Sequence, residues 1–216
     1  MSGQKINIPM LGAFLGVVAA IAAGLLSVVY ASTAEAIQLN FQKRTSTALE
    51  QILPAFDNVP ADETVTFLSK MKWPVKFYVA KKDGEIVGYA GEVVTPEGFS
   101  GDVTVMTSLK TDGTVDKVIV TANAETPGLG TVITDRKIRK TIVDLINGAA
   151  EAVGLPPNSY LDQYEGRKSE GTAWTVVNDG GDVDAKTGAT VTSRAVCGAV
   201  YAVSATCVEH LEELGK

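Results

Sequence analysis

The sequence predicts an α+β protein in which a single N-terminal transmembrane helix precedes one domain with an antiparallel sheet and a C-terminal helix. Three observations predict this fold class: a long uncharged apolar segment near the N-terminus, two hairpin patterns in the middle of the chain, and an apolar helical pattern at its end. Alternating apolar residues around an Asp-Gly pair are typical of a β-hairpin, and apolar residues three or four apart are typical of a helix.

Composition excludes several classes of protein. The chain has 216 residues, of which 45% are hydrophobic and 20% are charged, with two cysteines and one histidine. The apolar content is too high for a disordered chain, and two cysteines with one histidine are too few for a disulfide framework or a zinc site. The formal net charge of −6 does not suit a surface that neutralises phosphates, so we expect no nucleic-acid partner.

The apolar segment at 9–31 contains no charged residue and is long enough to cross a bilayer. At about 1.5 Å per residue a helix of this length extends about 35 Å, more than the bilayer core of about 30 Å. A cleaved signal peptide is the alternative, but its apolar region is usually about 7–15 residues long. We therefore predict a retained transmembrane helix after a short N-terminal segment at 1–8. Lys5 before it and Lys43 and Arg44 after it leave its orientation open.

After this helix we expect a linker and helical neck over 32–75, followed by a domain over 76–216. A helical pattern over 37–53 should end at Pro54, because proline does not continue a helix. Within the domain, each hairpin turns at an Asp-Gly pair, and the expected strands are 76–80 with 85–94 and 102–109 with 114–121. The remaining expected elements are a helix at 135–148, a short strand at 174–177 and a helix at 192–214.

Cys197 and Cys207 lie on the last predicted helix, ten residues and hence about 15 Å apart along its axis. A disulfide needs Cα atoms within about 7 Å, so we expect two buried free thiols. His210, near the end of the same helix, is assigned no catalytic role.

One segment that could bind a ligand is DAKTGATVTS at 184–193, which leads into the C-terminal helix. Its small residues let a ligand approach the backbone, and Lys186 together with the helix N-terminus could attract a phosphate. The segment also contains four hydroxyl side chains, those of Thr187, Thr190, Thr192 and Ser193. The alternative is a turn that ends in an ordinary Thr or Ser N-cap.

A second segment, NAETPGLG at 123–130, follows the second hairpin. Pro127 and two glycines predict a tight loop whose exposed backbone groups could hydrogen-bond the polar edge of a flat heterocycle. A connecting turn is the alternative. Neither segment on its own decides a function.

Together, ETPGLG at 125–130 and D-x-x-T-G-A-T-x-T at 184–192 resemble the FMN-binding domain family shared by the G subunit of the Rnf complex and the C subunit of the sodium-pumping NADH:quinone reductase. The resemblance also covers the N-terminal helix and DQYEGRK at 162–168. It implies that Thr190 bears FMN through a phosphoester bond. It further implies cofactor contacts from both motifs, at Glu125, Thr126, Gly128, Leu129, Gly130, Lys186, Thr187, Gly188, Ala189 and Thr192. The chain departs from the family at Asn123, where histidine is frequent, and at Ala185, where glycine is frequent.

The length, with one anchor and a compact domain, suits the Rnf protein better. The resemblance then implies a covalent flavoprotein that relays electrons through FMN in an ion-translocating ferredoxin:NAD⁺ oxidoreductase and has no catalytic side chain of its own. Expected partners are the other Rnf subunits, membrane lipid and, during maturation, a flavin transferase. The domain would face away from the cytoplasm at the inner membrane, with residues 1–8 inside. Alternatives are the C subunit of the quinone reductase, a stand-alone extracytoplasmic reductase, and a membrane-anchored scaffold without flavin.

Overall fold

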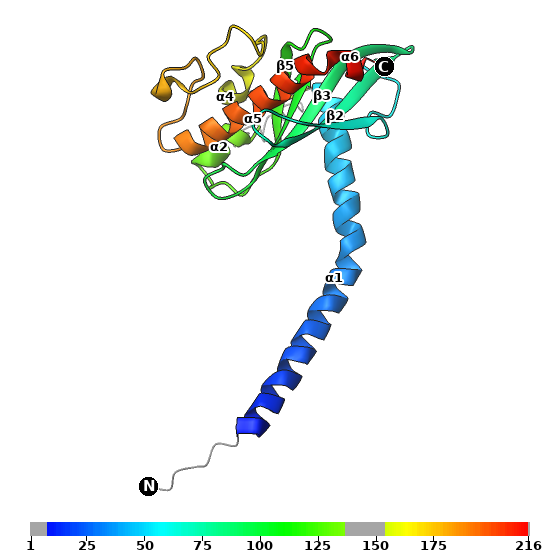
Figure 1. The fold of residues 1–216 in the computed structure, drawn as a ribbon, viewed down its shortest axis with the longest axis vertical. Coiled ribbons are helices and arrows are strands. Elements are labelled where there is room, and N and C mark those ends of the chain that lie inside the picture. Colours follow the sequence, from blue (N-terminus) through cyan, green and yellow to red (C-terminus); the bar gives the residue numbers. More distant parts are fainter. Residues whose placement is uncertain (1–7, 137–153, 216) are drawn as a thin grey trace, which may run out of the picture. The chain divides into compact units, whose positions relative to one another are not determined.

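The computed structural model describes residues 8–136 and 154–215. The chain divides into two compact units, Met1–Arg44 and Thr45–Lys216. Helix α1 (Ile8–Ile52) begins in the first unit and ends in the second (Figure 1). The helices predicted at 9–31 and 37–53 are therefore one element, which ends two residues before Pro54 as expected for a chain approaching proline.

The first unit consists, where described, of α1 alone. The stretch Pro9–Ile52 is long and apolar enough to cross a membrane, and no residue in its most apolar 18-residue segment is buried. Its surface has no polar stripe that would direct one face to a protein core. Helix α5 (Thr190–Glu209) passes the same length and hydropathy test, but 67% of its window is buried inside the second unit. We therefore identify α5 as a core helix.

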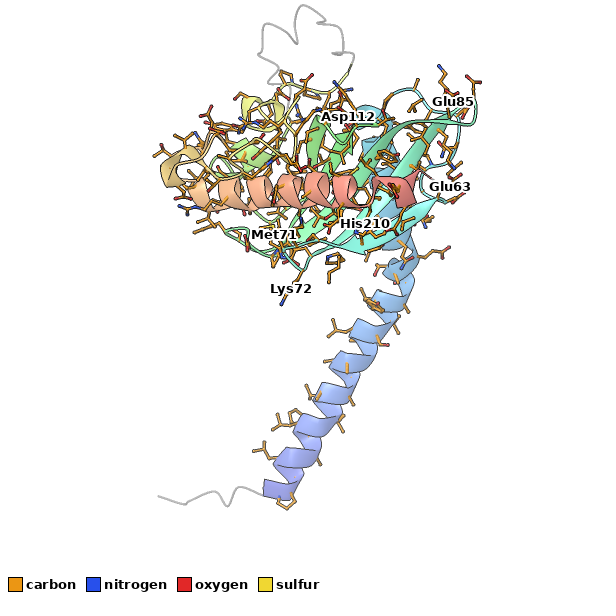
Figure 2. The ribbon with its side chains drawn as sticks, turned by 45° about the horizontal axis from the view of Figure 1, so that its top comes forward. Glu63, Met71, Lys72, Glu85, Asp112 and His210 are labelled. Atoms are coloured by element: carbon orange, nitrogen blue, oxygen red, sulfur yellow. The ribbon has the colours of Figure 1, made fainter. Side chains whose placement is uncertain are left out.

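The second unit is built on a five-stranded antiparallel sheet in which each strand pairs with its neighbour in sequence (Figure 1). The strands are β1 (Thr64–Leu68), β2 (Pro74–Lys82), β3 (Glu85–Thr95), β4 (Val103–Leu109) and β5 (Val115–Ala122). Both predicted hairpins are confirmed, as β2–β3 and β4–β5. Asp83 and Gly84 have φ values of 53° and 83°, the left-handed backbone that a two-residue hairpin turn needs, and Gly113 has a φ of 79°. Figure 2 labels Glu85 and Asp112 beside the two turns.

Side chains alternate between the two faces of this sheet, and each face is covered by a helix. On one face, strand residues such as Phe77 and Val105 pack with Val196 and Val200 of α5. Gly91 lies under α5, where a Cβ atom would overlap Val203, so glycine allows the close approach of helix and strand. On the opposite face, the last residues of α1 in this unit complete a second apolar cluster, Ala48, Leu49, Ile52 and Leu53 with Tyr78, Ala80, Ala90, Met106 and Ile119.

The structure differs from the sequence expectation in four places. Strand β1 lies inside the segment that we expected to be linker and neck, and it pairs with β2 through Thr64–Leu68. The strand predicted at 174–177 is wrong, because only Val176 forms a bridge, to Val183, and a 3-10 turn η1 (Val177–Asp179) follows at once. This segment pairs with itself across Gly180 and does not join the sheet.

The C-terminal helix begins earlier than predicted and is interrupted. Helix α5 starts at Thr190, stops at Glu209, and is followed by the short helix α6 (Leu211–Leu214). The helix predicted at 135–148 does not begin at Asp135, which is the extended C-cap of α2 (Gly130–Thr134), and most of that stretch lies outside the described residues. Cys197 and Cys207 are both free and buried, as predicted.

Candidate functional site

A cavity of about 270 Å³ brings the two sequence segments together at the start of α5. Its wall comes from three places: the loop after β3, the loop after β5 that leads into α2, and the turn that leads into α5. The lining residues are Phe99, Glu125, Thr126, Leu129, Gly130, Gly188, Ala189, Thr190, Val191 and Thr192. Sheet and helix thus place segments about sixty residues apart in the sequence around one space.

Glu125 holds the three parts of this wall together. Its side chain is buried, with the residue only 6% exposed. One carboxylate oxygen accepts the backbone N–H of Phe99 at 2.8 Å, and the other accepts the hydroxyl of Thr192 at 2.9 Å. Such bonds to an ionised group are among the stronger hydrogen bonds in proteins, and a buried carboxylate requires them. Asn123 supports the same residue, because its side-chain oxygen accepts the N–H of Glu125 at 3.1 Å.

Two glycines make room for this carboxylate. A Cβ atom on Gly130 would overlap the Glu125 side chain, and one on Gly98 would stand 2.9 Å from its Oε1. A larger residue at Gly130 would displace the carboxylate, and one at Gly98 would also overlap the Gly101 carbonyl and Val103. The Gly130 of the ETPGLG motif is therefore required by packing against the Glu125 of the same motif.

The first turn of α5 presents Thr190 to the cavity. The N-cap is Ala189, and none of the described residues caps this helix end with a side chain. The alternative of an ordinary Thr or Ser N-cap is thus wrong. The neighbouring hydroxyls point inward, because Thr192 bonds Glu125, and Ser193 donates to the carbonyl of Ala189 at 3.0 Å. The half-buried Thr190 lines the cavity together with Val191 and Thr192, so the first turn of α5, whose backbone N–H groups have no partner within the helix, borders this space.

The segment 162–168 holds the loop that leads into this turn. Gln163 forms two hydrogen bonds with the backbone of Asp184, accepting its N–H at 2.6 Å and donating to its carbonyl at 3.1 Å. Arg167 donates to the carbonyl of Asp182 at 2.8 Å. These contacts explain why the resemblance includes DQYEGRK: its side chains position the backbone that precedes Thr190.

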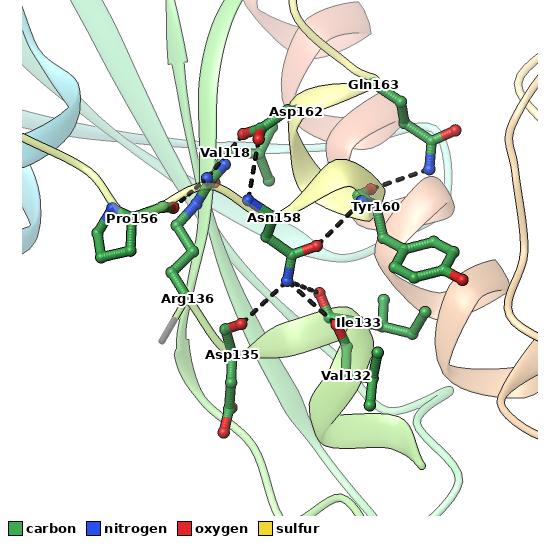
Figure 3. Close-up of polar contacts among 10 residues, drawn as sticks. All are labelled: Val118, Val132, Ile133, Asp135, Arg136, Pro156, Asn158, Tyr160, Asp162 and Gln163. Atoms are coloured by element: carbon green, nitrogen blue, oxygen red, sulfur yellow. Dashed lines mark hydrogen bonds and ion pairs between the residues drawn. The ribbon is translucent and has the colours of Figure 1, made fainter. Parts of the chain in front are cut away.

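A second polar network supports the other side of the site (Figure 3). Asn158 donates to the carbonyls of Val132, Ile133 and Asp135 at 3.0–3.2 Å and so closes the C-terminal end of α2. Arg136 donates to the carbonyl of Val118 on β5 and forms an ion pair with Asp162 at 2.7 Å. The sequence did not indicate Arg136, because it acts through contacts at least 18 positions away in the chain. Asn158 does have a local signal, since its side-chain oxygen accepts the N–H of Tyr160 and caps helix α4 (Ser159–Asp162), but its three bonds to α2 cross at least 23 positions.

A second cavity of about 440 Å³ lies beside this network. Pro127, Gly128, Thr131 and Asn158 are among its lining residues. The turn 126–131 therefore contributes to two cavities, with Leu129 and Gly130 lining one and Gly128 lining the other.

Comparison with known proteins identifies the family. Residues 98–204 match the model of the FMN-binding domain, and residues 1–52 match that of the RnfG N-terminal region. The chain is 32% identical over 208 residues to the G subunit of the ion-translocating oxidoreductase complex of Vibrio cholerae serotype O1 (strain ATCC 39541), covering 94% of this chain and 91% of the relative. The chain belongs to the RnfG family. Relatives with the same name are those of Pseudoalteromonas atlantica, 33% identical over 195 residues (88% and 83% covered), and Erwinia tasmaniensis, 33% identical over 197 residues (88% and 84%).

Eight of the eleven residues expected from the RnfG resemblance line the smaller cavity; they are Glu125, Thr126, Leu129, Gly130, Gly188, Ala189, Thr190 and Thr192. Gly128 lines the neighbouring cavity, while Lys186 and Thr187 are absent from the described lining of both. Phe99 and Val191 also line the site and were not predicted. The one sequence signal for Phe99 is an aromatic residue inside the turn PEGFSG at 96–101.

The residues present fit an FMN group. A threonine hydroxyl and the uncapped start of α5 suit its phosphate. The cavity is smaller than the roughly 300–1,000 Å³ of sites that enclose a ligand of this size, so part of the group would extend over the rim. That rim is apolar and open: Phe99 is 70% exposed, Leu129 46% and Val191 41%. In the described part of the chain, no cluster of three or more His, Cys, Asp or Glu residues could hold a metal ion.

Proposed function

We propose that this RnfG-family chain is a membrane-anchored flavoprotein that carries FMN on Thr190 and relays electrons within an ion-translocating oxidoreductase complex. One observation supports it above the others: the two motifs converge on one cavity, and Thr190 lies in its wall. The family match to an FMN-binding domain over 98–204, and relatives named as subunits of an ion-translocating oxidoreductase complex, support the same function.

Attachment of the cofactor uses the Thr190 hydroxyl as nucleophile. A flavin transferase would join Thr190 Oγ1 to the phosphorus of the FMN half of FAD; the pyrophosphate bond breaks, AMP leaves, and the hydroxyl loses its proton. The resulting phosphodiester keeps one negative charge. That charge would lie at the start of α5, where backbone N–H groups and the helix dipole favour an anion.

The protein then supplies position and environment, and bound FMN supplies the capacity to accept and donate electrons. Glu125 links the Phe99 loop to Thr192, so the apolar rim and Thr190 are held in one arrangement. Remaining contacts that the motifs predict, from Lys186, Thr187 and Gly128, belong to the same proposal. A covalent bond has a physical reason, because outside the cytoplasm no flavin pool would refill an emptied site.

Helix α1 is proposed as the single membrane anchor, with its span at 9–31. Support comes from its wholly unburied apolar window and from the match of residues 1–52 to the RnfG N-terminal region. Residues 1–8 would be cytoplasmic, and the second unit, Thr45–Lys216, which begins inside the expected neck over 32–75 and includes the domain expected over 76–216, would lie outside the inner membrane. Its partners there are the other Rnf subunits and lipid.

The test is intact-mass analysis and peptide mapping of the full chain purified from its native membrane and denatured. We expect the mass of FMN less one water on the peptide that contains Thr190. Thr190→Val should carry none, and Thr111→Val, which removes an exposed hydroxyl in the turn between β4 and β5 that does not line the cavity, should carry the full amount. An unmodified Thr190 in native membranes would overturn the flavoprotein function and favour a scaffold.

A further inference from the structure

Arg194 lies one helical turn after Thr190 on α5. Residues four apart on a helix share a face, with Cβ atoms about 5–6 Å apart, and helical side chains lean toward the N-terminus. The Arg194 side chain is therefore directed over the turn that begins at Thr190. It is 48% exposed, so a group attached to Thr190 could reach it.

Asp179 holds the Arg194 guanidinium by one edge. Nε donates to Oδ2 of Asp179 at 2.6 Å, and Nη2 donates to Oδ1 at 2.8 Å. These bonds lower the pKa of the Asp179 carboxyl and raise the pKa of Arg194, so the pair stays ionised over the physiological range. A guanidinium has five N–H donors, of which this side-on contact uses two. The end formed by Nη1 and the second hydrogen of Nη2 is left for another acceptor.

Asp179 itself is placed by its loop. It ends the 3-10 turn Val177–Asp179, which closes against the Val176–Val183 bridge and is followed by the left-handed Gly180. The Asp179 carboxylate therefore lies on a short loop that is held by the bridge, and it contacts α5 at Arg194. This arrangement orients the arginine before any ligand arrives.

Other polar groups near Thr190 are already engaged. The hydroxyls of Thr192 and Ser193 donate to Glu125 and to the Ala189 carbonyl. Glu125 is an acid and would repel a phosphate, so a cation nearby is needed to offset it. Neither Lys186, the cation that the sequence suggested, nor Arg194 is among the described residues that line the Thr190 cavity. Arg194, however, lies one turn after Thr190 on the same helix, and Asp179 fixes the position of its guanidinium.

We propose that Arg194, oriented by Asp179, binds the phosphate group that joins the flavin to Thr190. The inference rests on the proposed function and names a residue that neither sequence motif includes. Arginine suits this task because its planar fork matches two phosphate oxygens at once. Asp179 is a positioning residue, since it contacts the guanidinium and not the phosphate.

The experiment compares full chains produced with an active flavin transferase: wild type, Arg194→Gln, Arg194→Lys and Asp179→Asn. Lys70→Gln is the matched control, because it removes one surface cation that pairs with Glu209 at the other end of the same helix. The readouts are the ³¹P resonance of the attached phosphodiester, folded and denatured, and the initial rate of flavin incorporation by intact mass.

For Arg194→Gln we expect the folded ³¹P resonance to move toward its denatured position and the incorporation rate to fall about five- to tenfold, as for loss of a partly exposed charge-assisted hydrogen bond. Arg194→Lys and Asp179→Asn should give intermediate shifts, because the first keeps the charge without the fork and the second keeps the fork without its orientation. Lys70→Gln should match wild type in both readouts.

The outcomes separate the two proposals. If wild-type chain carries no flavin, the proposed function fails. If wild-type chain is flavinylated and the Arg194→Gln resonance coincides with it, the phosphate contact is overturned and the function stands. Circular dichroism of each variant checks folding. If Arg194→Gln does not fold, the ³¹P resonance of Arg194→Lys tests the phosphate contact in its place. An unshifted resonance in Asp179→Asn beside a shifted one in Arg194→Gln would overturn the positioning role.

Discussion

The two ends of helix α5 are built in opposite ways. At the C-terminal end, the N–H of His210 bonds the carbonyls of Thr206 and Cys207, and the His210 ring stacks on Phe67 with centroids 4.0 Å apart. At the N-terminal end the cap is Ala189, whose methyl side chain cannot accept a hydrogen bond from the backbone N–H groups of the helix. One end is closed by the protein itself, and the other is left open beside a cavity.

This difference separates a supporting end from a binding end. Closing both ends would give the more stable helix, since a side-chain N-cap contributes about 1 kcal/mol. The hydroxyls of its first turn do not cap it, because Thr192 donates to Glu125 and Ser193 donates to the Ala189 carbonyl. The open end therefore has a use other than stability, which agrees with a phosphate bound there.

The largest effect is expected at the open end. Glu125→Ala should lower the free energy of unfolding by about 2–4 kcal/mol, because the Phe99 N–H and the buried Thr192 hydroxyl lose their acceptor. It should also reduce flavin incorporation. Urea titration and intact mass measure the two effects. Glu97→Ala, an exposed acid on the same loop as Phe99, is the control and should change stability by less than about 0.5 kcal/mol. If both variants lost stability and flavin to the same extent, Glu125 would have no specific role in the site.

Next in size is the protection of the two thiols on α5. Burial raises the pKa of Cys197 to about 11 and that of Cys207 to about 12, against an ordinary value of 9.0. Two pKa units are about a hundredfold in thiolate, or about 2.7 kcal/mol, so maleimide labelling at pH 8 should be at least about a hundredfold slower in folded than in urea-unfolded chain. Rapid labelling of Cys197 alone would show that the half of α5 nearer the site opens locally.

A smaller effect is expected at the closed end. Phe67→Ala removes the ring on which His210 stacks and should cost about 1–2 kcal/mol of stability. Flavin incorporation should stay at the wild-type level, because no described residue of the cavity touches this stack. Urea titration and intact mass again give both values. Loss of flavin in this variant would mean that the two ends of α5 are coupled.

The smallest effect concerns acid stability away from both ends. Hydrogen bonds from Thr114, with help from Lys168, lower the pKa of Asp112 to about 2 from its ordinary 3.8. A lowered pKa stabilises the folded state above about pH 4, and this contribution is lost as the pH falls toward 2. In Asp112→Asn, the free energy of unfolding should change less steeply with pH between about pH 4 and 2. The difference from wild type should be less than about 1 kcal/mol, since the Asp112–Lys168 pair is exposed. Glu85→Gln, at the other hairpin, is the control (Figure 2). A curve for Asp112→Asn that overlays wild type would show that these bonds do not persist in solution.

Local patterns predicted most of the secondary structure. Asp83 and Gly84 adopt the backbone that their residue types favour, and α1 ends before Pro54, because these preferences act within a few bonds. Strand β1 was not predicted, since it is held by pairing with β2 and its own alternation is weak. The stretch 174–177 is the opposite case, because its residues favour a strand but no strand forms. Only Val176 pairs, through a single bridge to Val183.

The sequence by itself determined the apolar helix, the two hairpins, the family and the motif that contains Thr190. Only the tertiary structure decided which groups meet around that residue. Glu125 bonds Thr192 across 67 positions of chain, and Arg194 meets Asp179 across 15. Such contacts depend on how the sheet and α5 bring distant loops together, and side-chain hydrogen bonds at that separation leave no periodic pattern to read. Residue type sets what each group can do, and packing sets what it faces.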